Sequence, residues 1–167
     1  MKQLRALPIL ALLLAAACGD QPTTLAPGDA LLAKGGTGNP HFIGQPRFGD
    51  LGTTLQVTGT IAGLGTGAVD IVVTASGSGT IECTNPGGNV APGQTKELTV
   101  SGAQTNVTPD QGRVDFTVST TAPVAPQDAC PNLQWTPSVV DVDFTTATIT
   151  VTQTATGALL LEETFEL

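Results

Sequence analysis

The sequence predicts an all-β protein, specifically a two-sheet antiparallel β-sandwich of immunoglobulin-like architecture with eight or nine short strands. Apolar and polar residues alternate with a period of two in many segments, which is typical of half-buried antiparallel strands. Turn-forming residues separate these segments at short intervals, and the chain holds 20 Gly and 12 Pro. No segment after the first 17 residues has a convincing helical pattern, so the fold class rests on strands alone.

Three parts are expected along the chain: a signal peptide at 1–17, a tether at 18–40 and the β-sandwich domain at 41–167. Residues 1–5 are basic, and residues 6–17 are apolar and rich in Leu and Ala. Twelve residues at ~1.5 Å each are too short for a ~30 Å hydrocarbon core, so this pattern predicts a secretory leader rather than a membrane span.

The tether is rich in Pro, Gly and Thr and has little apolar surface to bury. Such a composition predicts a flexible spacer. Its glycine run at 35–38 lacks the Lys-Ser/Thr pair of a phosphate-binding loop, so no nucleotide site is expected there.

The junction between leader and tether reads Leu14-Ala-Ala-Ala-Cys18-Gly19. It resembles the lipobox of bacterial lipoproteins, which implies cleavage before Cys18 and lipidation of its thiol. The acylated N-terminus would then bind the lipid bilayer. Ala15 departs from the lipobox pattern, which usually has Leu at this position. Residues 15–17 also satisfy the small-x-small rule for ordinary signal-peptide cleavage, so a freely secreted protein is the alternative. In such lipoproteins an Asp directly after the cysteine usually signals retention in the inner membrane. Here that residue is Gly19, so the outer membrane is the favoured destination. The expected location is the bacterial cell envelope, facing the periplasm or the exterior.

In the first half of the domain, residues 53–62 alternate most clearly, with Leu55, Val57 and Ile61 on one face. Pro46 interrupts the preceding apolar segment and restricts it to a sheet edge or a bend. Gly77-Ser78-Gly79 is interpreted as a turn. The strands expected here are residues 41–48, 53–62, 68–76 and 80–84.

In the second half, residues 102–111 are polar and are expected to form a loop, with at most a brief strand around Val107. A Pro-rich crossover at 122–132 ends at Cys130. The strands expected here are residues 95–101, 113–121, 140–151 and 158–167.

The apolar pattern of the strand at 140–151 changes phase at Thr145-Thr146. A slip of one residue would turn every side chain to the other face, so we expect a β-bulge or a sheet switch there. Val140, Val142 and Phe144 are assigned to the core face before it. In the last strand, Glu163 shares a face with apolar side chains, which is typical of a protected edge strand. Those side chains are Leu159, Leu161, Phe165 and Leu167.

The chain is acidic, with a formal net charge of −8 that becomes −10 once Lys2 and Arg5 leave with the leader. A polyanion repels nucleic acid and anionic lipid headgroups. We therefore expect no binding of DNA or RNA. The expected partner is a protein or a glycan of unknown identity.

Cys83 and Cys130 are the two cysteines left when Cys18 is assigned to lipid. Disulfides persist in exported proteins, so we expect these two to pair and to join the two sheets. The bond would close a loop of ~48 residues and contribute roughly 4 kcal/mol in the chain-entropy model. Two cysteines and the distant His41 are too few for a metal site.

Trp135, the only tryptophan, follows both cysteines rather than lying between them as in immunoglobulin domains. It has two interpretations. It packs in the core beside the disulfide, or it is an exposed platform on which a sugar stacks.

Several short motifs occur together: Asn39-Pro-His-Phe42, Ala62-Gly-Leu-Gly65, Cys83 with Gly87-Gly88, Cys130-Pro-Asn132 with Trp135, and Asp143-Phe-Thr145. Over residues 39–167 this layout resembles an uncharacterised group of small exported bacterial β-domain proteins. The resemblance implies an exported β domain with one disulfide and carries over no active site.

The residues offer little for catalysis, since His41 is the only histidine and no serine lies in a nucleophile motif. Asp141 and Asp143 share a strand face and are weak candidates for acid–base chemistry, or for Ca²⁺ together with Asp70 or Asp115. A solvated face is the other interpretation, because no regular calcium loop is visible. We therefore expect no enzyme and no cofactor, but a binding or structural domain; the alternative is a carbohydrate-binding module.

Overall fold

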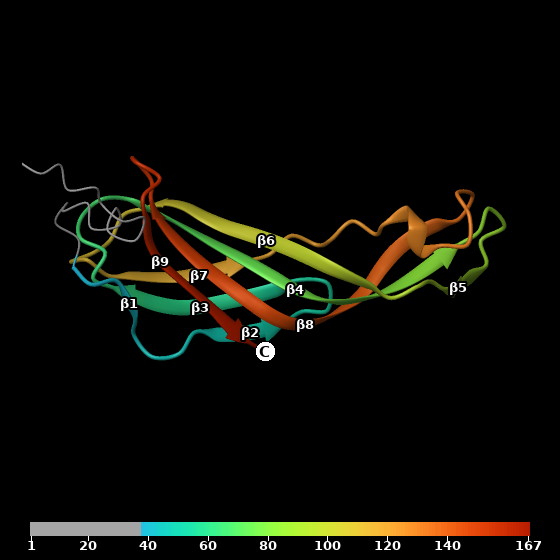
Figure 1. Cartoon of the computed structure of the whole chain (residues 1–167), viewed down its shortest axis with the longest axis horizontal. Coiled ribbons are helices and arrows are strands. Elements are labelled where there is room, and N and C mark those ends of the chain that lie inside the picture. Colours follow the sequence, from blue (N-terminus) through green and yellow to red (C-terminus); the bar gives the residue numbers. More distant parts are fainter. Residues whose placement is uncertain (1–37) are drawn as a thin grey trace, which may run out of the picture. The chain divides into compact units, whose positions relative to one another are not determined.

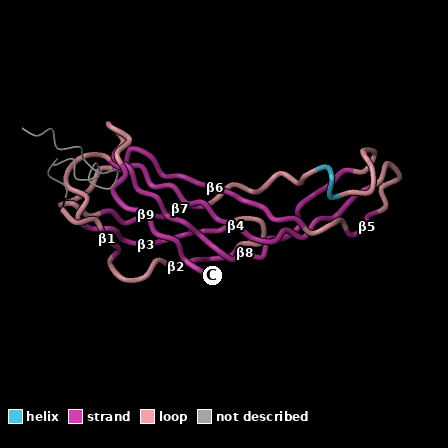
Figure 2. Tube along the Cα trace, viewed as in Figure 1, coloured by secondary structure: helices cyan, strands magenta, loops and turns pink. Residues whose placement is uncertain are grey.

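The computed structural model describes residues 38–167, which form two antiparallel sheets with nine β-strands and one short 3-10 helix. Figure 1 and Figure 2 show strands throughout this part of the chain. The predicted all-β sandwich is thus confirmed. Within the same residues, no helix has the length and hydropathy needed to cross a bilayer. The signal peptide at 1–17, the lipidation site Cys18 and the tether up to residue 37 lie outside the described residues.

The smaller sheet is built around β3 (Leu55–Ala62). β7 (Val114–Ser119) pairs with one edge of β3, and two short strands share the other edge. These are β1 (His41–Phe42) and β2 (Arg47–Asp50), separated by the buried Pro46. The interruption expected from this proline is present, because a proline lacks the N–H that a continuous strand would donate.

The larger sheet is built around β4 (Val69–Thr84) and β8 (Thr136–Gln153), which pair along the whole length of β4. β9 (Leu159–Glu166) pairs with the far edge of β8. The other edge of β4 pairs with β6 (Lys96–Val107) and then with β5 (Val90–Pro92). In Figure 1 the end of this sheet that carries β5 lies away from the strands of the smaller sheet.

The hydrophobic core lies between the inner faces of the two sheets. Thr120 is the one buried polar residue of the described chain, and it is satisfied: its N–H donates to Leu55 O, and its Oγ1 accepts from Leu55 N, both at 2.9 Å. The core residues are Leu55, Val57, Ile61, Leu64, Val69, Ile71, Val73, Ala75, Val100, Val114, Phe116, Val118, Val142, Phe144, Ala147, Ile149 and Val151.

The turn expected at 77–79 is wrong, because β4 runs unbroken through it. These glycines allow close packing. A Cβ on Gly77 would lie 2.3 Å from the backbone oxygen of Asp143 on β8, and one on Gly79 would lie 2.2 Å from a methyl of Leu98. The sequence pattern alone cannot distinguish a glycine that turns the chain from one that lets another strand approach.

The bulge expected near Thr145 is confirmed. Ser76 pairs with Thr146 and Gly77 pairs with Phe144, so Thr145 is the extra residue on β8. A second bulge follows the same logic at Val140, since Thr80 pairs with Asp141 and Ile81 pairs with Val139. The assignment of Val140 to the core is therefore wrong: it is 44% exposed, and Val139 packs against the core in its place.

A third bulge, at Leu160 on β9, corrects the expected face of the last strand. Leu161 and Phe165 pack against the core as predicted, but Leu159 is turned outward and is exposed, as is Leu167. Glu163 pairs with the buried Ile149, so its side chain lies on the inward-pointing face of an edge strand. There it is exposed to solvent, as expected for a charge that discourages edge-to-edge pairing.

The loop expected at 102–111 is wrong in its first half, because β6 continues to Val107. Asn106 near its end has a positive φ of 55°, and its N–H donates to Asp70 Oδ1 at 2.7 Å. Thr154 Oγ1 donates to the same oxygen at 2.8 Å. The carboxylate thus joins the end of β6 to the turn after β8, which local alternation does not reveal.

Replacing Gly77 with Ala should destabilise the domain by about 1–3 kcal/mol, because the added methyl meets the backbone of β8 rather than a flexible side chain. Urea unfolding measures the difference. The matched control is Gly49→Ala on β2, where the nearest atom to a new Cβ is 3.8 Å away and the change should stay within ~1 kcal/mol. Equal effects of the two substitutions would contradict the close-packing explanation.

Candidate functional site

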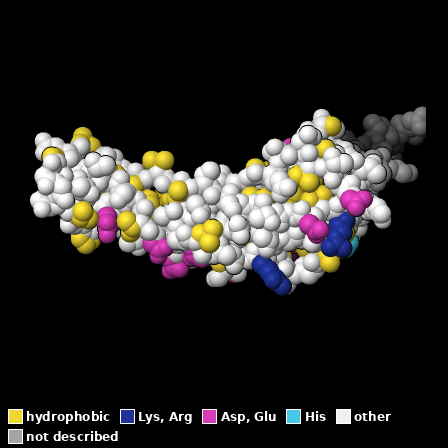
Figure 3. All heavy atoms as spheres, turned by 180° about the vertical axis from the view of Figure 1, so that it is seen from behind, with side chains coloured by type: hydrophobic (Ala, Val, Ile, Leu, Met, Phe, Trp, Pro, Cys, Tyr) yellow, Lys and Arg dark blue, Asp and Glu magenta, His cyan; other side chains and the backbone are white. Residues whose placement is uncertain are grey.

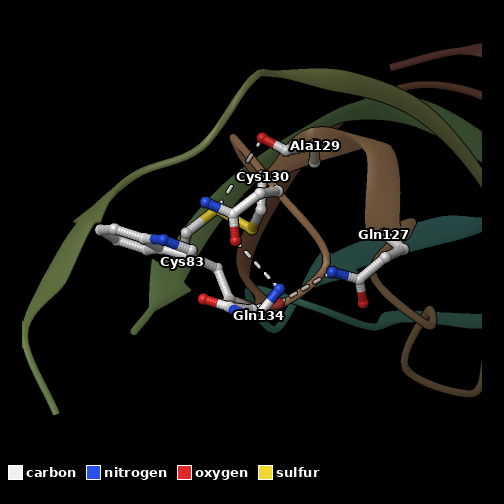
Figure 4. Close-up of a disulfide and its surroundings, with 7 residues drawn as sticks. Cys83, Gln127, Ala129, Cys130 and Gln134 are labelled. Atoms are coloured by element: carbon white, nitrogen blue, oxygen red, sulfur yellow. Dashed lines mark hydrogen bonds between the residues drawn. A yellow bond between two sulfur atoms is a disulfide. The ribbon is translucent and has the colours of Figure 1, made fainter. Parts of the chain in front are cut away.

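The predicted disulfide is present between Cys83 and Cys130, with an S–S distance of 1.96 Å and a Cα–Cα distance of 5.8 Å. Cys83 lies on β4, and Cys130 directly follows the 3-10 helix η2 (Gln127–Ala129) in the crossover from β7 to β8. Figure 4 shows the bond with Gln127, Ala129 and Gln134 around it. The expectation that the bond joins the two sheets is therefore wrong: it joins the larger sheet to a crossover.

The disulfide has a small buried cluster of its own, made of Ile81, Cys83 and Ala129. None of these residues belongs to the main core. Gly93 closes the cluster from β5's side, since a Cβ there would lie 2.9 Å from Cys83 Sγ. The 3.8 Å approach of Cys83 Sγ to Ala129 O is a packing contact, because a disulfide sulfur carries no proton to donate.

The crossover is also held by three polar contacts. Ala129 O accepts from Gln94 N at 2.9 Å, and Gln127 Nε2 donates to Trp135 O at 2.8 Å. Lys96 Nζ forms an ion pair with Asp128 at 3.0 Å. We call this end of the larger sheet, with the crossover bound to it, the distal arm (residues 80–95 and 122–141).

Trp135 lies in the distal arm, immediately before β8, and is half-buried. It is neither part of the main core nor among the side chains packed against that core. Trp135 is therefore not a residue of the main core, and packing of its ring beside the disulfide stays a prediction. Leu133, two residues earlier in the chain, is 86% exposed.

The candidate metal residues do not come together. Asp141 and Asp143 are exposed on the outer face of β8, opposite Thr80 and Ser78. Asp70 lies at the other end of the β4–β8 ladder, where it already accepts two hydrogen bonds, and Asp115 lies on the other sheet. In residues 38–167 no group of three or more His, Cys, Asp and Glu side chains could hold a metal ion.

His41 is exposed at the start of β1, and its Nδ1 lies 2.7 Å from the backbone oxygen of Asn39. This contact orients the ring towards its own backbone. No hydrogen bond in the described residues joins His41 to a hydroxyl, thiol or carboxylate side chain.

A polar hollow on the smaller sheet was not predicted. Its volume is about 570 Å³, and its lining includes Arg47 from β2, Thr58 and Thr60 from β3, and Asp115 from β7. The alternation at 53–62 predicted an outward polar face for β3. The strands that flank it could not be predicted, because that pairing depends on long-range register.

Asp115 is the most strongly organised charge in this hollow. Thr60 Oγ1 donates to its Oδ1 at 2.5 Å, and Arg113 Nη2 donates to the same oxygen at 3.3 Å. The Thr60 hydrogen bond, followed by the Arg113 hydrogen bond, holds the pKa of Asp115 below its ordinary value of 3.8. The carboxylate in the hollow therefore stays ionised to a lower pH than an ordinary aspartate does.

No protein-family model and no curated protein matches this sequence. One similar solved structure is "Structure of beta-glucosidase 3B from Thermotoga neapolitana in complex with alpha-D-glucose", at 15% sequence identity and a TM-score of 0.27. The match covers 76% of this chain and 15% of that chain. A TM-score this low does not establish a shared fold, and the resemblance to the exported bacterial group stays a prediction.

Thr60→Val should raise the pKa of Asp115 towards its ordinary value, because it removes the hydrogen bond that contributes most to the shift. NMR titration of the Asp115 carboxyl carbon measures this. In the wild type the folded-state pKa of Asp115 is depressed, so the Asp115 carboxylate stabilises the folded protein. This contribution to the free energy of unfolding is present above pH ~4 and is lost as the pH falls through the folded-state pKa. The melting temperature of Asp115→Asn should accordingly approach that of wild type as the pH falls below ~4.

The control for this titration is Thr117→Val, a neighbouring outward hydroxyl on β7 that makes no hydrogen bond to Asp115. It should leave the Asp115 titration unchanged. An Asp115 pKa that is the same in wild type and in Thr60→Val would refute the assigned cause.

Proposed function

We propose that this chain is an exported, lipid-anchored protein of the bacterial cell envelope whose β-sandwich is a non-enzymatic binding or structural domain. The Cys83–Cys130 disulfide is the observation that carries the proposal. Such bonds persist in oxidising compartments outside the cytosol, and the apolar leader with its small-residue junction at Cys18 provides a route there.

The non-enzymatic part of the proposal is supported by how the titratable side chains are used. His41 contacts the nearby backbone of Asn39, and Asp70 joins the end of β6 to the turn after β8. Asp141 and Asp143 face solvent. General acid–base or nucleophilic catalysis requires at least two such groups within hydrogen-bond reach of one substrate. The proposed partner is a protein or a glycan, because the net negative charge disfavours nucleic acid.

A carbohydrate-binding module is the second candidate, and the position of Trp135 favours it. A half-buried aromatic side chain outside the main core keeps part of its surface accessible to a ligand while its backbone is held in place. Sugar rings stack on such faces through their apolar C–H groups. Most of the face drawn in Figure 3 is neither hydrophobic nor ionised.

Cys18→Ser should move the protein from the detergent phase to the aqueous phase in a detergent-partitioning assay of whole-cell extracts. The serine cannot carry the thioether-linked lipid. The variant therefore loses the membrane-binding free energy of the acyl chains, which is ~0.8 kcal/mol per buried CH₂. Thr24→Ser, an equally small change in the same segment, should leave the protein in the detergent phase. Detergent partitioning that persists in Cys18→Ser would end the lipoprotein assignment.

Trp135→Ala should weaken binding to envelope polysaccharide by about tenfold or more if the second candidate is right, since aromatic anchors dominate such contacts. Calorimetry with purified polysaccharide measures the affinity. Leu133→Ala, which removes an exposed neighbour, is the control and should bind as wild type does. Equal binding by Trp135→Ala, or none by wild type, rules this candidate out and leaves the lipid-anchor proposal standing.

A further inference from the structure

We propose that the Cys83–Cys130 disulfide is a redox-sensitive clamp on the distal arm. When the bond is reduced, the crossover leaves the end of the larger sheet and the arm frays, while the two-sheet sandwich stays folded. The arm is thus a local unit whose order depends on the thiol–disulfide balance around the protein.

The sandwich does not depend on the arm for its core. The core residues contributed by β4 end at Ala75, and those contributed by β8 begin at Val142. From the arm only Val139 packs against this core, and it is half-buried. Since burial of apolar surface is the main stabilising term, loss of the arm removes little from the sandwich.

The arm, in contrast, has few buried contacts of its own, although β4 and β8 stay paired through it as far as Thr84 and Thr136. Its buried cluster holds three residues, Ile81, Cys83 and Ala129, and β5 contributes only three paired residues. The Lys96–Asp128 ion pair is exposed, with the Asp128 side chain 76% accessible, so it is screened by water and adds little. Without the covalent bond, the crossover is held to the sheet mainly by the Gln94–Ala129 hydrogen bond, because the Gln127–Trp135 hydrogen bond lies within the crossover itself.

Fraying of the arm should stop at the β-bulge in β8, where the arm meets the sandwich. The bulge at Val140 interrupts pairing between β8 and β4 at the base of the arm, and Gly79 precedes it on β4. Val142, just beyond the bulge, is fully buried, and its N–H donates to Gly52 O in the turn after β2 at 3.0 Å. This contact ties β8 to the smaller sheet, so opening that starts at the disulfide should end there.

The reduction step requires a dithiol, such as dithiothreitol or a thioredoxin-like protein. One dithiol thiolate attacks Sγ of the half-buried Cys130 rather than that of the fully buried Cys83. A mixed disulfide forms at Cys130, and Cys83 leaves as a thiolate that takes up a proton. The second dithiol sulfur then displaces Cys130 and closes the oxidised dithiol, so two electrons reduce one disulfide to two thiols.

Trp135 makes the proposal testable, because it is the only tryptophan in the chain and lies in the arm. The full-length mature protein is reduced with dithiothreitol at neutral pH and 20 °C, and thiol alkylation followed by mass spectrometry confirms that the bond is open. Acrylamide quenching of Trp135 then reports on the arm, and far-UV circular dichroism reports on the sheets. We expect the quenching constant to rise about twofold or more, with a red-shifted emission, while most of the β-sheet signal is kept because the sandwich stays folded.

The Cys83→Ser/Cys130→Ser variant is the control for effects of the reductant itself. It should show the raised quenching constant without dithiothreitol and should not respond when dithiothreitol is added. Loss of the circular dichroism signal together with the fluorescence change would overturn the proposal, because the arm and sandwich would then unfold as one. Unchanged quenching in the reduced protein, or a bond that dithiothreitol cannot open in the folded protein, would overturn it as well.

Discussion

The antiparallel pairing of β4 with β8 is the interaction on which the rest of the structure depends. Every residue of β4 has a partner on β8, so the register of this one ladder determines which side chains face inward in the larger sheet. β9 extends the sheet from β8, and β6 and β5 extend it from β4. The smaller sheet then packs on the inner face that this register creates, and the core residues of both sheets meet there.

The disulfide stabilises the protein in a different way from the inter-sheet bond of immunoglobulin domains. It lies at one end of the larger sheet, away from the main core, and its native contacts are local. The loop that it closes nevertheless contains β5, β6 and β7. It therefore restricts the unfolded chain over a long segment, which the chain-entropy model values at roughly 4 kcal/mol. One bond thus has a local effect in the folded state and a global one in the unfolded state.

The surface of the described residues is better suited to binding than to chemistry. Charged residues make up only 12% of the chain, and much of the surface in Figure 3 is hydroxyl, amide and backbone. Two of the carboxylates are already engaged, Asp70 with a hydroxyl and a backbone amide, and Asp115 with a hydroxyl and a guanidinium group. A sheet face of this kind offers many weak hydrogen-bonding groups and few reactive ones, which suits recognition of a large neutral partner.

The sequence by itself determined the strand content, most of the inward faces, the cysteine pair and the bulge at Thr145, because alternation and its phase are local properties of the chain. Only the tertiary structure decided that Gly77 lies inside a strand, that Val140 is turned outward, and that the bond of Cys130 joins its crossover to the larger sheet instead of joining the two sheets. The same holds for the hollow around Asp115. Each of these depends on which distant segment lies opposite, and a period of two carries no information about the register between strands.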